Sequence, residues 1–541
     1  MDARTWKLAL NTLLLSGATC AISLPVGTVL AWLLLRTDLP VRRIGMMLLG
    51  LMLFVPLYLH AAAWQAAFGV QGWCTLSYGV PAWLDRWPGA IWVHAVAAIP
   101  WVVLIVGVGL LLIEPELEEQ ALLDGSSRQV FCRVTLPAAL PAVGAAALWI
   151  ALATAGEMTV TDLMRVRTYA EEVYTQLAIG QEPGEAALEI LPGAALSALL
   201  VAAGLMLCAA LAPRDRPPSW QHRWVFRLGR LRGPITLLTA AAILLLVGLP
   251  LGSLCYKAGV VVSPTEAGPV RSWSPVKCQW MIAAAPWRYR GEFGWSLLIG
   301  TLAAAGAVAA AIPLAWWARR DGWRALPLVT ITAVCLAVPG PIVGLAAMWL
   351  LNRPDSAWLR FLYDRSILAP WLALMVRGLP AATLVLWHAL RTVPAELLES
   401  AAVDGAGPLA RLWRVALGSR WSAVAVAFLV TFAVVLGDLA ASILVVPPGV
   451  TTLSIQVFGL LHYGVEDQAA GICLALILLF AAVACAVAWL VRGGARDERK
   501  VGRDDPAAWG EGKYNRWMAR DTKLVQKAAT AGRAKQADRL P

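Results

Sequence analysis

The chain has 541 residues, of which 59% are hydrophobic and 15% are charged, and its mean hydropathy is +0.66. Soluble globular domains carry a charged fraction of roughly a quarter, so this composition excludes an ordinary soluble protein and predicts an all-α polytopic membrane protein embedded in the lipid bilayer. The net charge of +11 is spread over short loops and the C-terminal segment, which is typical of membrane topology and does not predict a nucleic-acid-binding surface.

Apolar runs long enough to cross about 30 Å of hydrocarbon recur along the chain. They predict about eleven transmembrane helices, or twelve if a further span precedes the first. The predicted spans are residues 8–35, 44–67, 89–113, 138–158, 186–212, 234–256, 293–317, 325–351, 368–391, 421–446 and 468–491. Loops rich in arginine, at 36–43, 212–233 and 318–324, are expected in the cytoplasm, which places the N-terminus outside.

Two polar segments interrupt this pattern. The first, EEQALLDGSSRQVFCRVTLP, covers residues 118–137, and the second, LLESAAVDGAGPLARLWRVALG, covers residues 397–418. A charged side chain at the centre of a bilayer costs roughly 2.5–3.5 kcal/mol, so neither segment can cross the membrane. Each predicts a short amphipathic helix, an Asp-Gly turn with its glycine at positive φ, and a second helix on the cytoplasmic surface.

The resemblance between the two polar segments extends along the chain and indicates an internal duplication. The matching pieces are residues 11–25 with 300–313, LFVP (53–56) with LAVP (336–339), Pro100 with Pro380, and GEMTVTDLM (156–164) with GDLAASILV (437–445). Six predicted spans separate the polar segments. Because this number is even, both segments emerge on the same face and the two repeats are parallel.

The duplication defines the predicted domains. Residues 1–212 form the first repeat, residues 213–233 a basic cytoplasmic linker, residues 234–491 the second repeat and residues 492–541 a basic cytoplasmic tail. The span at 234–256 has no counterpart in the first repeat. The tail is interpreted as a solvated, partly disordered segment, with a docking element as the alternative.

The polar segments share the pattern Glu-x-Ala-x-x-x-Gly, followed by an apolar residue and a closing Leu-Pro or Leu-Gly. The residues that carry it are Glu119, Ala121, Gly125 and Pro137 in the first copy and Glu399, Ala401, Gly405 and Leu417 in the second. This pattern resembles the EAA loop of permease subunits of binding-protein-dependent ABC importers. The departures from the family pattern are Gln120 inside the first motif, a first copy that is one residue short between Gly125 and Val134, and Gly418 where the family has proline.

The resemblance implies a multi-pass permease of the bacterial inner membrane, similar in its fused layout to ferric iron and thiamine permeases. In that family the segment between the helices, the coupling helix, docks on an ATP-binding subunit. Two copies therefore imply an ATPase dimer as partner, together with an extracytoplasmic substrate-binding protein. No cofactor is expected on this chain, because ATP and magnesium would be bound by the ATPase.

The chain itself offers no catalytic pattern. The phosphate-binding pattern GxxxxGK[ST], a Ser-His-Asp grouping and an HExxH helix are all absent from the sequence, so we expect a non-catalytic transport subunit whose ATP is hydrolysed by a partner chain. An ion-coupled secondary transporter is the alternative from another class. A membrane enzyme or scaffold is a third.

Glu157 and Asp438 are the candidate pathway residues, because each follows a glycine near the outer end of the span after a polar segment. A pair of acids facing a pore would favour a cation, whereas acids at the outer interface would simply be solvated. Ferric iron is the first expectation for the cargo, and thiamine, a polyamine or an oxyanion remain open. His94 and Arg377, near the outer starts of the preceding spans, are explained equally by snorkelling to the interface or by transport.

Nine cysteines are scattered along the chain, mostly inside apolar runs, without metal-binding spacing. Cys255 and Cys278 flank or lie within the outer loop at 257–292. A disulfide between these two residues is a hypothesis from their position.

Overall fold

The computed structural model describes residues 3–178, 226–265, 268–320 and 322–503, together with the isolated residues Ala202 and Met206. Among them, 7 helices are long and apolar enough to cross a membrane, and 10 if each of three bent helix pairs counts as one span. The prediction of an all-α polytopic membrane protein is confirmed. The predicted span at 186–212 lies outside the described residues, apart from those two isolated positions.

The part of the chain before the linker forms a group of packed helices. Its elements are α1 (Ala3–Arg36), α2 (Arg42–Met52), α3 (Leu57–Phe68), α4 (Trp73–Tyr78), α5 (Arg86–Leu112), α6 (Pro115–Asp124), α7 (Ser127–Val130), the π-helical turn η1 (Phe131–Thr135), α8 (Leu136–Ala155), α9 (Thr159–Leu163) and α10 (Tyr169–Ala178). Helices α1, α5 and α8 pack against one another in all three combinations.

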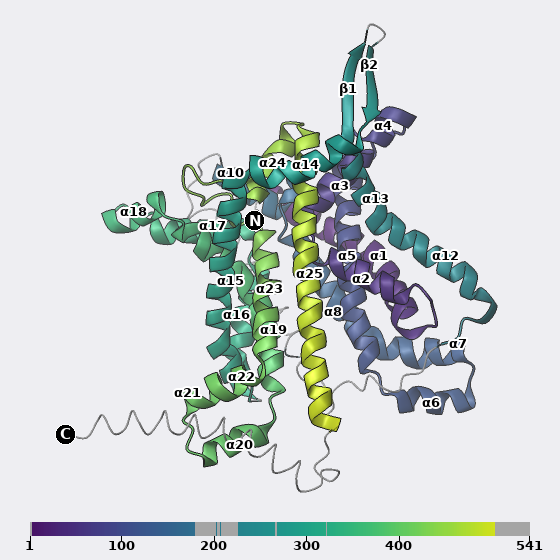
Figure 1. The fold of residues 1–541 in the computed structure, drawn as a ribbon, viewed down its shortest axis with the longest axis vertical. Helices are drawn as coiled ribbons and strands as arrows, with labels where there is room; N and C mark the ends of the chain where they lie inside the picture. The colour runs from purple at the N-terminus through teal and green to yellow at the C-terminus, as the bar shows by residue number, and fades with distance from the viewer. Residues whose placement is uncertain are drawn as a thin grey trace.

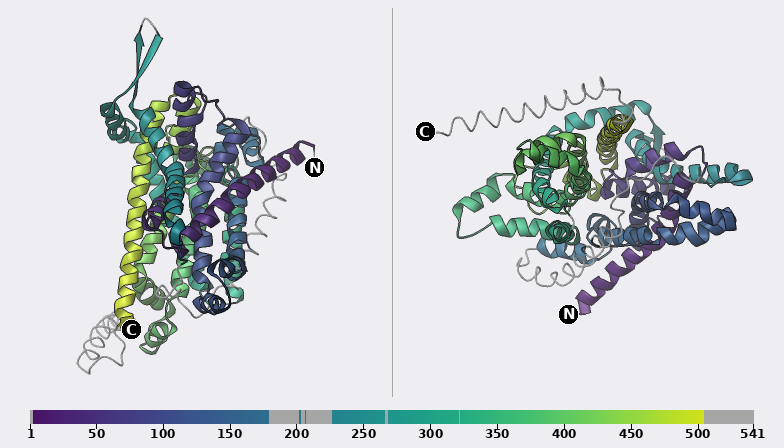
Figure 2. Two further views of the ribbon diagram at one scale, coloured as in Figure 1. Left: turned by 90° about the vertical axis from the view of Figure 1, so that its right-hand side faces the viewer. Right: turned by 90° about the horizontal axis from the view of Figure 1, so that it is seen from below.

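The part after the linker contains a second such group. Its elements are η2 (Gly229–Leu231), α12 (Arg232–Ile243), the π-helical turn η3 (Leu244–Gly248), α13 (Leu249–Gly259), β1 (Val260–Thr265), β2 (Gly268–Trp273), α14 (Pro275–Arg288), α15 (Arg290–Ala318), η4 (Trp323–Ala325), α16 (Leu326–Ala337), α17 (Gly340–Leu351), α18 (Ala357–Arg365), α19 (Leu368–Arg391), α20 (Ala395–Val403), α21 (Pro408–Ala410), the π-helical turn η5 (Arg411–Ala416), α22 (Leu417–Ser419), α23 (Trp421–Leu436), α24 (Leu453–His462) and α25 (Glu466–Arg503). Helices α15, α19 and α23 make the same three pairwise contacts as α1, α5 and α8. Seen from below, the purple and blue helices of the first group and the green helices of the second stand side by side (Figure 2).

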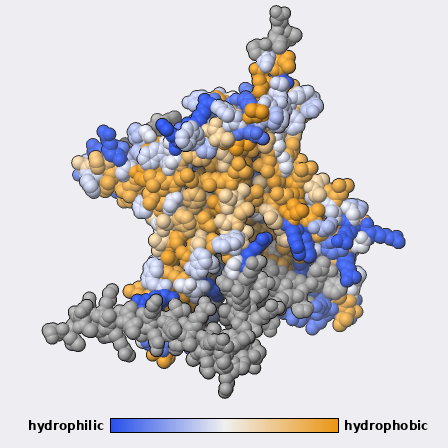
Figure 3. Space-filling model, viewed as in Figure 1, coloured by the Kyte–Doolittle hydropathy of each residue, from blue (hydrophilic) through white to orange (hydrophobic). Residues whose placement is uncertain are grey.

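Small residues allow the long helices to approach closely. A Cβ atom added to Gly27 of α1 would lie 2.4 Å from Cβ of Val102 in α5, and one added to Gly109 of α5 would lie 2.3 Å from Cβ of Ala142 in α8. Without a hydrophobic drive between helices in lipid, such close packing is a main source of their association. Apolar residues cover the middle of the visible face and hydrophilic residues gather at its upper and lower margins, as expected for a membrane-spanning surface (Figure 3).

Two predicted spans are not straight. The span predicted at 44–67 is divided into α2 and α3, which meet at 108°, and that at 325–351 into α16 and α17, which meet at 104°. The breaks fall at Pro56 and Pro339, the prolines of the LFVP and LAVP pieces, and each proline is extended and precedes the first residue of the next helix. Proline supplies no N–H and disfavours the α conformation in the residue before it, so each helix ends and restarts there.

Each break lies against the other half of the chain. A Cβ atom added to Gly437, which follows α23, would lie 2.6 Å from Cγ of Pro56, and one added to Gly156, which follows α8, would lie 3.8 Å from Cα of Pro339. The two halves therefore meet through reciprocal contacts, with the proline of one half beside the glycine of the other.

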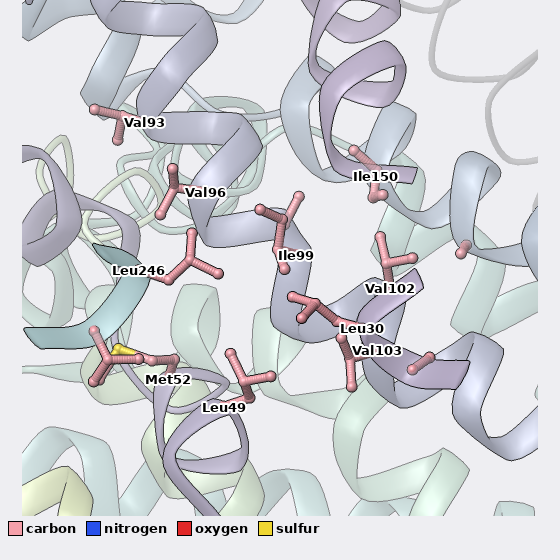
Figure 4. Packing of buried hydrophobic residues seen from close by; sticks show 14 of the residues in the cluster. Leu30, Leu49, Met52, Val93, Val96, Ile99, Val102, Val103, Ile150 and Leu246 are labelled. Carbon is pink, nitrogen blue, oxygen red and sulfur yellow. The ribbon is translucent and has the colours of Figure 1, made fainter. Parts of the chain in front are cut away.

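The helix after the linker packs on the first half. Ile243, Leu246 and Val247 belong to the same buried cluster as Val96 and Met52 (Figure 4). The boundary predicted at residue 234 therefore does not coincide with a boundary in the packing. The domain limits themselves stay predictions.

The outer loop predicted at 257–292 contains regular structure that the sequence reasoning did not expect. Strands β1 and β2 form an antiparallel hairpin, with Val260 opposite Trp273 at its base, and it projects from the upper end of the molecule (Figure 1). The disulfide expected between Cys255 and Cys278 is wrong, because both are free cysteines. They belong to α13 and α14, which pack against each other.

The last helix runs past residue 492, where the predicted tail begins. Helix α25 continues to Arg503 as one element of 38 residues. Residues 504–541, the remainder of the predicted tail, lie outside the described residues.

Candidate coupling segments and pathway residues

The two polar segments lie at the same end of the molecule, the lower end in Figure 1, where α6 and α20 are labelled. Each contains the expected short helix, turn and second helical piece. In the first segment these are α6 followed by α7 and η1, and in the second α20 followed by α21 and η5. Both second pieces contain a π-helical turn, a feature that often occurs at functional sites.

The motif residues of the short helices divide into exposed and buried positions. Glu119 and Glu399 are exposed, Ala121 is half-buried and Ala401 is buried. One face of each helix therefore lies against the protein, while the glutamates of the motif face away from it.

The most exposed apolar residues of these segments were missed by sequence reasoning. Leu123 and Val403, which precede the two Asp-Gly turns, are 86% and 88% exposed. Leu117 and Leu397, one to two turns earlier, are 50% and 44% exposed. Apolar side chains presented in this way at matching positions indicate a surface for contact with another protein. The sequence could have identified Leu123 and Val403, because each directly precedes the Asp-Gly pair of its own segment.

The two turn glycines differ in conformation. Gly405 has φ of 83°, as expected for a left-handed turn. The same expectation is wrong for Gly125, which has φ of −148° and ψ of 163° and is therefore extended. Its neighbour Ser126 forms a capping box with Gln129, in which the Ser126 N–H donates to Oε1 of Gln129 at 2.9 Å and Ser126 Oγ accepts from the Gln129 N–H at 3.4 Å. This capping box begins α7 directly after the turn, and the backbone of Gly125 before it is extended.

The ends of the two segments also differ. Pro137 stands exposed in the first turn of α8, and residues 131–155 form one continuous span. In the second segment Leu417 is buried, and the helical pieces 408–419 and 421–436 meet at 78°. The bend falls just after Gly418, the residue that replaces the proline of the family pattern.

A buried charged network holds the first segment in place. Arg36, at the end of α1, is 1% exposed and forms an ion pair with Glu118 of α6, which is 0% exposed. Arg36 also donates to the Leu110 carbonyl of α5 at 3.3 Å, and the Thr135 hydroxyl of η1 donates to Glu118 Oε1 at 2.6 Å. The Glu118 carboxylate thereby joins α6 to α1 and η1, and Arg36 extends the network to α5.

The second segment has an apolar contact in the same place. Leu398 is buried in a cluster that includes Leu390 of α19 and Leu412 of η5. Sequence reasoning missed this difference, because it singled out Glu119 and Glu399 and not the residue before each. Arg36, at the end of the apolar run of α1, was the sequence feature that indicated a buried charge, but its partner Glu118 could not be predicted from the sequence.

Glu157 is held by its own backbone surroundings and by a histidine. Its two carboxylate oxygens accept hydrogen bonds from the N–H groups of Thr159 at 2.6 Å and Val160 at 3.0 Å, so it caps the start of α9. Nε2 of the buried His94 lies 3.4 Å from Oε2 of Glu157. The other ring nitrogen of His94 lies 2.8 Å from the Ala90 carbonyl.

Asp438 has a corresponding arrangement. Arg377 Nε donates to Asp438 Oδ2 at 2.8 Å, and the Ala441 N–H donates to Oδ1 at 2.9 Å. Arg377 also donates to the Val338 carbonyl at 3.3 Å, so it reaches the break between α16 and α17.

These contacts change the interpretation of both acids. The side chains of Glu157 and Asp438 are 17% and 8% exposed, so neither is a freely solvated interface residue. The guanidinium group of Arg377 balances the charge of Asp438, whereas His94 balances that of Glu157 only when its imidazole is protonated. His94 and Arg377 do not snorkel to the interface, because each points to the acid of its own half.

A further contact joins the two halves near α9 and α24. Nε2 of His462 lies 3.2 Å from Oδ2 of Asp162, and its Nδ1 lies 3.1 Å from the Phe458 carbonyl. The hydrogen bond to Asp162 raises the pKa of His462 above its ordinary value, although burial opposes the shift.

In the described part of the chain, no group of three or more His, Cys, Asp or Glu side chains is placed to hold a metal ion. The candidate sites therefore consist of the two polar segments at one end and the two paired acids near the contact between the halves.

Comparison with known proteins places these features in a family. Residues 304–496 match the family described as the inner membrane component of binding-protein-dependent transport systems. The matched range includes the second polar segment and Asp438 but not the first polar segment.

Two curated relatives are similar to part of this chain. The molybdenum transport system permease protein ModB of Escherichia coli K12 is 28% identical over 202 residues, which cover 34% of this chain and 86% of that protein. Its counterpart from Escherichia coli O157:H7 matches to the same extent. With its apolar spans and its matched domain, this chain is a multi-pass membrane protein that is similar to the inner-membrane permeases of binding-protein-dependent ABC importers.

Proposed function

We propose that this chain forms the translocation path of an ABC importer and couples it to a separate ATPase dimer through its two polar segments. The observation that carries the proposal is the pair of exposed apolar residues, Leu123 and Val403, at matching positions on α6 and α20. Each would sit in a groove of one ATPase subunit. ATP and magnesium would be bound and hydrolysed there, and an extracytoplasmic binding protein would deliver the substrate at the opposite face.

The contacts of the segments suggest how motion is transmitted. The first segment is joined to α1 and α5 by Arg36 and Glu118, and the second is embedded through Leu398 in the cluster that includes α19. A displacement of α6 would therefore move α1 and α5, and a displacement of α20 would move α19. The reciprocal contacts at Pro56 and Pro339 lie where the two halves would move against each other.

For the cargo we propose an oxyanion of the molybdate class in place of ferric iron. Both relatives are molybdenum transport permeases, and molybdenum in oxygenated water is the molybdate anion. Arg377 beside Asp438, and the backbone hydrogen bonds that hold Glu157 at the start of α9, argue against a pair of free acids that would attract a cation. Helices α3 and α17 restart behind Pro56 and Pro339, and helix N-termini at such breaks are suited to anions.

The coupling is tested by co-purification. The tagged chain would be expressed with the ATPase and binding protein encoded beside it and isolated in mild detergent. Leu123→Asp with Val403→Asp places a charge in each groove and should abolish ATPase recovery. A matched control, Val262→Asp with Val270→Asp, changes two half-exposed valines of the β-hairpin at the opposite end and should retain the ATPase.

The results separate the alternatives. Equal recovery with the two double variants would contradict docking through α6 and α20. A wild-type protein that carries no ATPase, yet transports its cargo along a proton or sodium gradient, would favour the secondary transporter. The cargo itself is tested by uptake of labelled molybdate and labelled ferric iron in cells that express the whole system, where the proposal expects molybdate uptake alone.

A further inference from the structure

A pocket of about 500 Å³ lies beside the turn between α1 and α2, at the end of the molecule that carries the polar segments. Its lining consists of Asp38, Leu39, Pro40, Arg42, Arg43 and Arg232. The first five residues belong to the first half, and Arg232 begins α12, the helix that follows the linker. The pocket therefore opens at a joint between the two parts of the chain.

The joint is fixed by local contacts. The Phe226 N–H donates to the Arg36 carbonyl at 2.8 Å, and the Leu228 N–H donates to Asp38 Oδ1 at 3.1 Å. Phe226 is buried against Trp32 and lies beside Phe131 of the first polar segment. The walls of the pocket are thus held by residues other than the arginines.

The charge in the pocket is unbalanced. Asp38 is its single acid, and its Oδ2 lies 3.6 Å from Nε of Arg232. The side chains of Arg42 and Arg43 form no ion pair or hydrogen bond with any residue that the structure describes. The N-termini of α2 and α12, where these arginines lie, add positive dipole ends. The pocket therefore favours an anion with several oxygen acceptors, such as a phosphate group.

The surroundings indicate where the phosphate comes from. Ile44 and Met47 of α2 are 64% and 65% exposed, Leu231 beside α12 is 62% exposed, and Leu237 of α12 is 73% exposed. In a membrane protein such side chains face acyl chains. A basic pocket at the edge of an apolar surface matches a phospholipid, with its head group in the pocket and its tails along α2 and α12.

The corresponding turn in the second half uses its arginines differently. Arg319 lies over the ring of Trp316 with its guanidinium carbon 3.5 Å from the centroid, and Arg324 lies near the rings of Trp317 and Trp323. Both guanidinium groups face aromatic rings, and neither lines the pocket beside the first turn. The second turn therefore offers similar charge at the same end of the molecule, with these two arginines placed against aromatic rings.

We propose that the pocket formed by Arg42, Arg43 and Arg232 binds the head-group phosphate of an anionic phospholipid. The bound lipid would then hold α12, the helix that follows the linker, against the first half of the chain. This proposal depends on the proposed function in one respect, namely that the pocket lies on the cytoplasmic side of the membrane. Its test measures lipid binding alone, so it can fail or succeed independently of the ATPase.

The experiment is a lipid titration followed by native mass spectrometry on the whole chain purified in detergent. Phosphatidylglycerol and phosphatidylcholine are added separately to the wild type, to Arg42→Gln/Arg43→Gln and to the control Arg320→Gln/Arg324→Gln. A surface arginine contributes roughly fivefold to binding of an anionic lipid, so the first variant should bind phosphatidylglycerol roughly twenty-five-fold more weakly. The control should bind it as the wild type does, and phosphatidylcholine should bind weakly to all three.

Three results would overturn the proposal. Equal weakening in both variants would show that the charge of the whole basic rim attracts the lipid. Equal binding of the two lipids to the wild type would show that the head-group charge is not recognised. Displacement of phosphatidylglycerol by millimolar inorganic phosphate would assign the pocket to a small free anion. A melting curve of each variant checks that weaker binding does not come from loss of the fold.

Discussion

Replacement of Glu118 by alanine should loosen the first polar segment, because it leaves a charged arginine without its partner inside the protein. Arg36 and Glu118 are 1% and 0% exposed, so water cannot replace the lost contact without opening the structure. Removal of one partner of a buried ion pair costs about 3–5 kcal/mol. Glu118→Ala also removes the acceptor of the Thr135 hydrogen bond, and this loss is included in the same free-energy cost.

This cost can be measured as local opening. Since about 1.4 kcal/mol corresponds to a factor of ten, the opening constant of the α6 segment should rise by a factor of roughly 10² to 4 × 10³. Amide hydrogen exchange followed by mass spectrometry on residues 115–135 reports this opening in the purified protein. Glu119→Ala is the matched control, because its side chain is exposed and such substitutions change stability by only about 0.5 kcal/mol.

Equal exchange rates in the two variants would refute the claim that the Arg36–Glu118 pair holds the segment. A second variant distinguishes the effect of the unpaired Arg36 charge from the effect of the space left by the shorter alanine side chain. Arg36→Met with Glu118→Met removes both charges and fills the space, so it should restore much of the protection that Glu118→Ala loses.

Further predictions concern the turns, the paired acids and the contact between the halves. Gly405→Ala should cost about 1–2 kcal/mol because of its positive φ, whereas the extended Gly125→Ala should cost less than about 0.5 kcal/mol, as measured by unfolding in mixed micelles. Asp438→Ala should lower stability by about 1.5–3 kcal/mol through its lost charged hydrogen bonds, while Asp438→Asn should leave the choice of cargo unchanged in uptake assays. Because the pKa of His462 is raised, its contact with Asp162 stabilises the fold below the unfolded value of about 6.5 and loses this effect as pH rises through the folded pKa. The wild type should therefore lose more thermal stability than Asp162→Asn between about pH 6 and pH 8.

The features that could be predicted from the sequence are those set by hydropathy and charge. Apolar runs identified the membrane spans, and charges that no bilayer tolerates identified the polar segments. The prolines at 56 and 339 were found as repeated positions, but the bends of 108° and 104° were not predicted, because hydropathy does not distinguish a straight span from a broken one.

The contacts that define the sites could not be predicted, because they join residues far apart in the chain. Arg36 and Glu118 are separated by 82 positions, and Arg377 and Asp438 by 61. Glu157 and Asp438 were recognised from their repeated surroundings, yet their charge balance depends on partners that only the packing brings near. Gly125 and Gly405 share a sequence pattern but differ in φ, because a capping box follows only the first.

ATP-driven import is best tested by transport in proteoliposomes that contain this chain and its partner ATPase, with the binding protein and labelled molybdate outside. We expect accumulation that requires ATP inside, persists when the proton and sodium gradients are collapsed, and is lost with Leu123→Asp/Val403→Asp. Accumulation that continues without ATP and stops when those gradients are collapsed would contradict ATP-driven import.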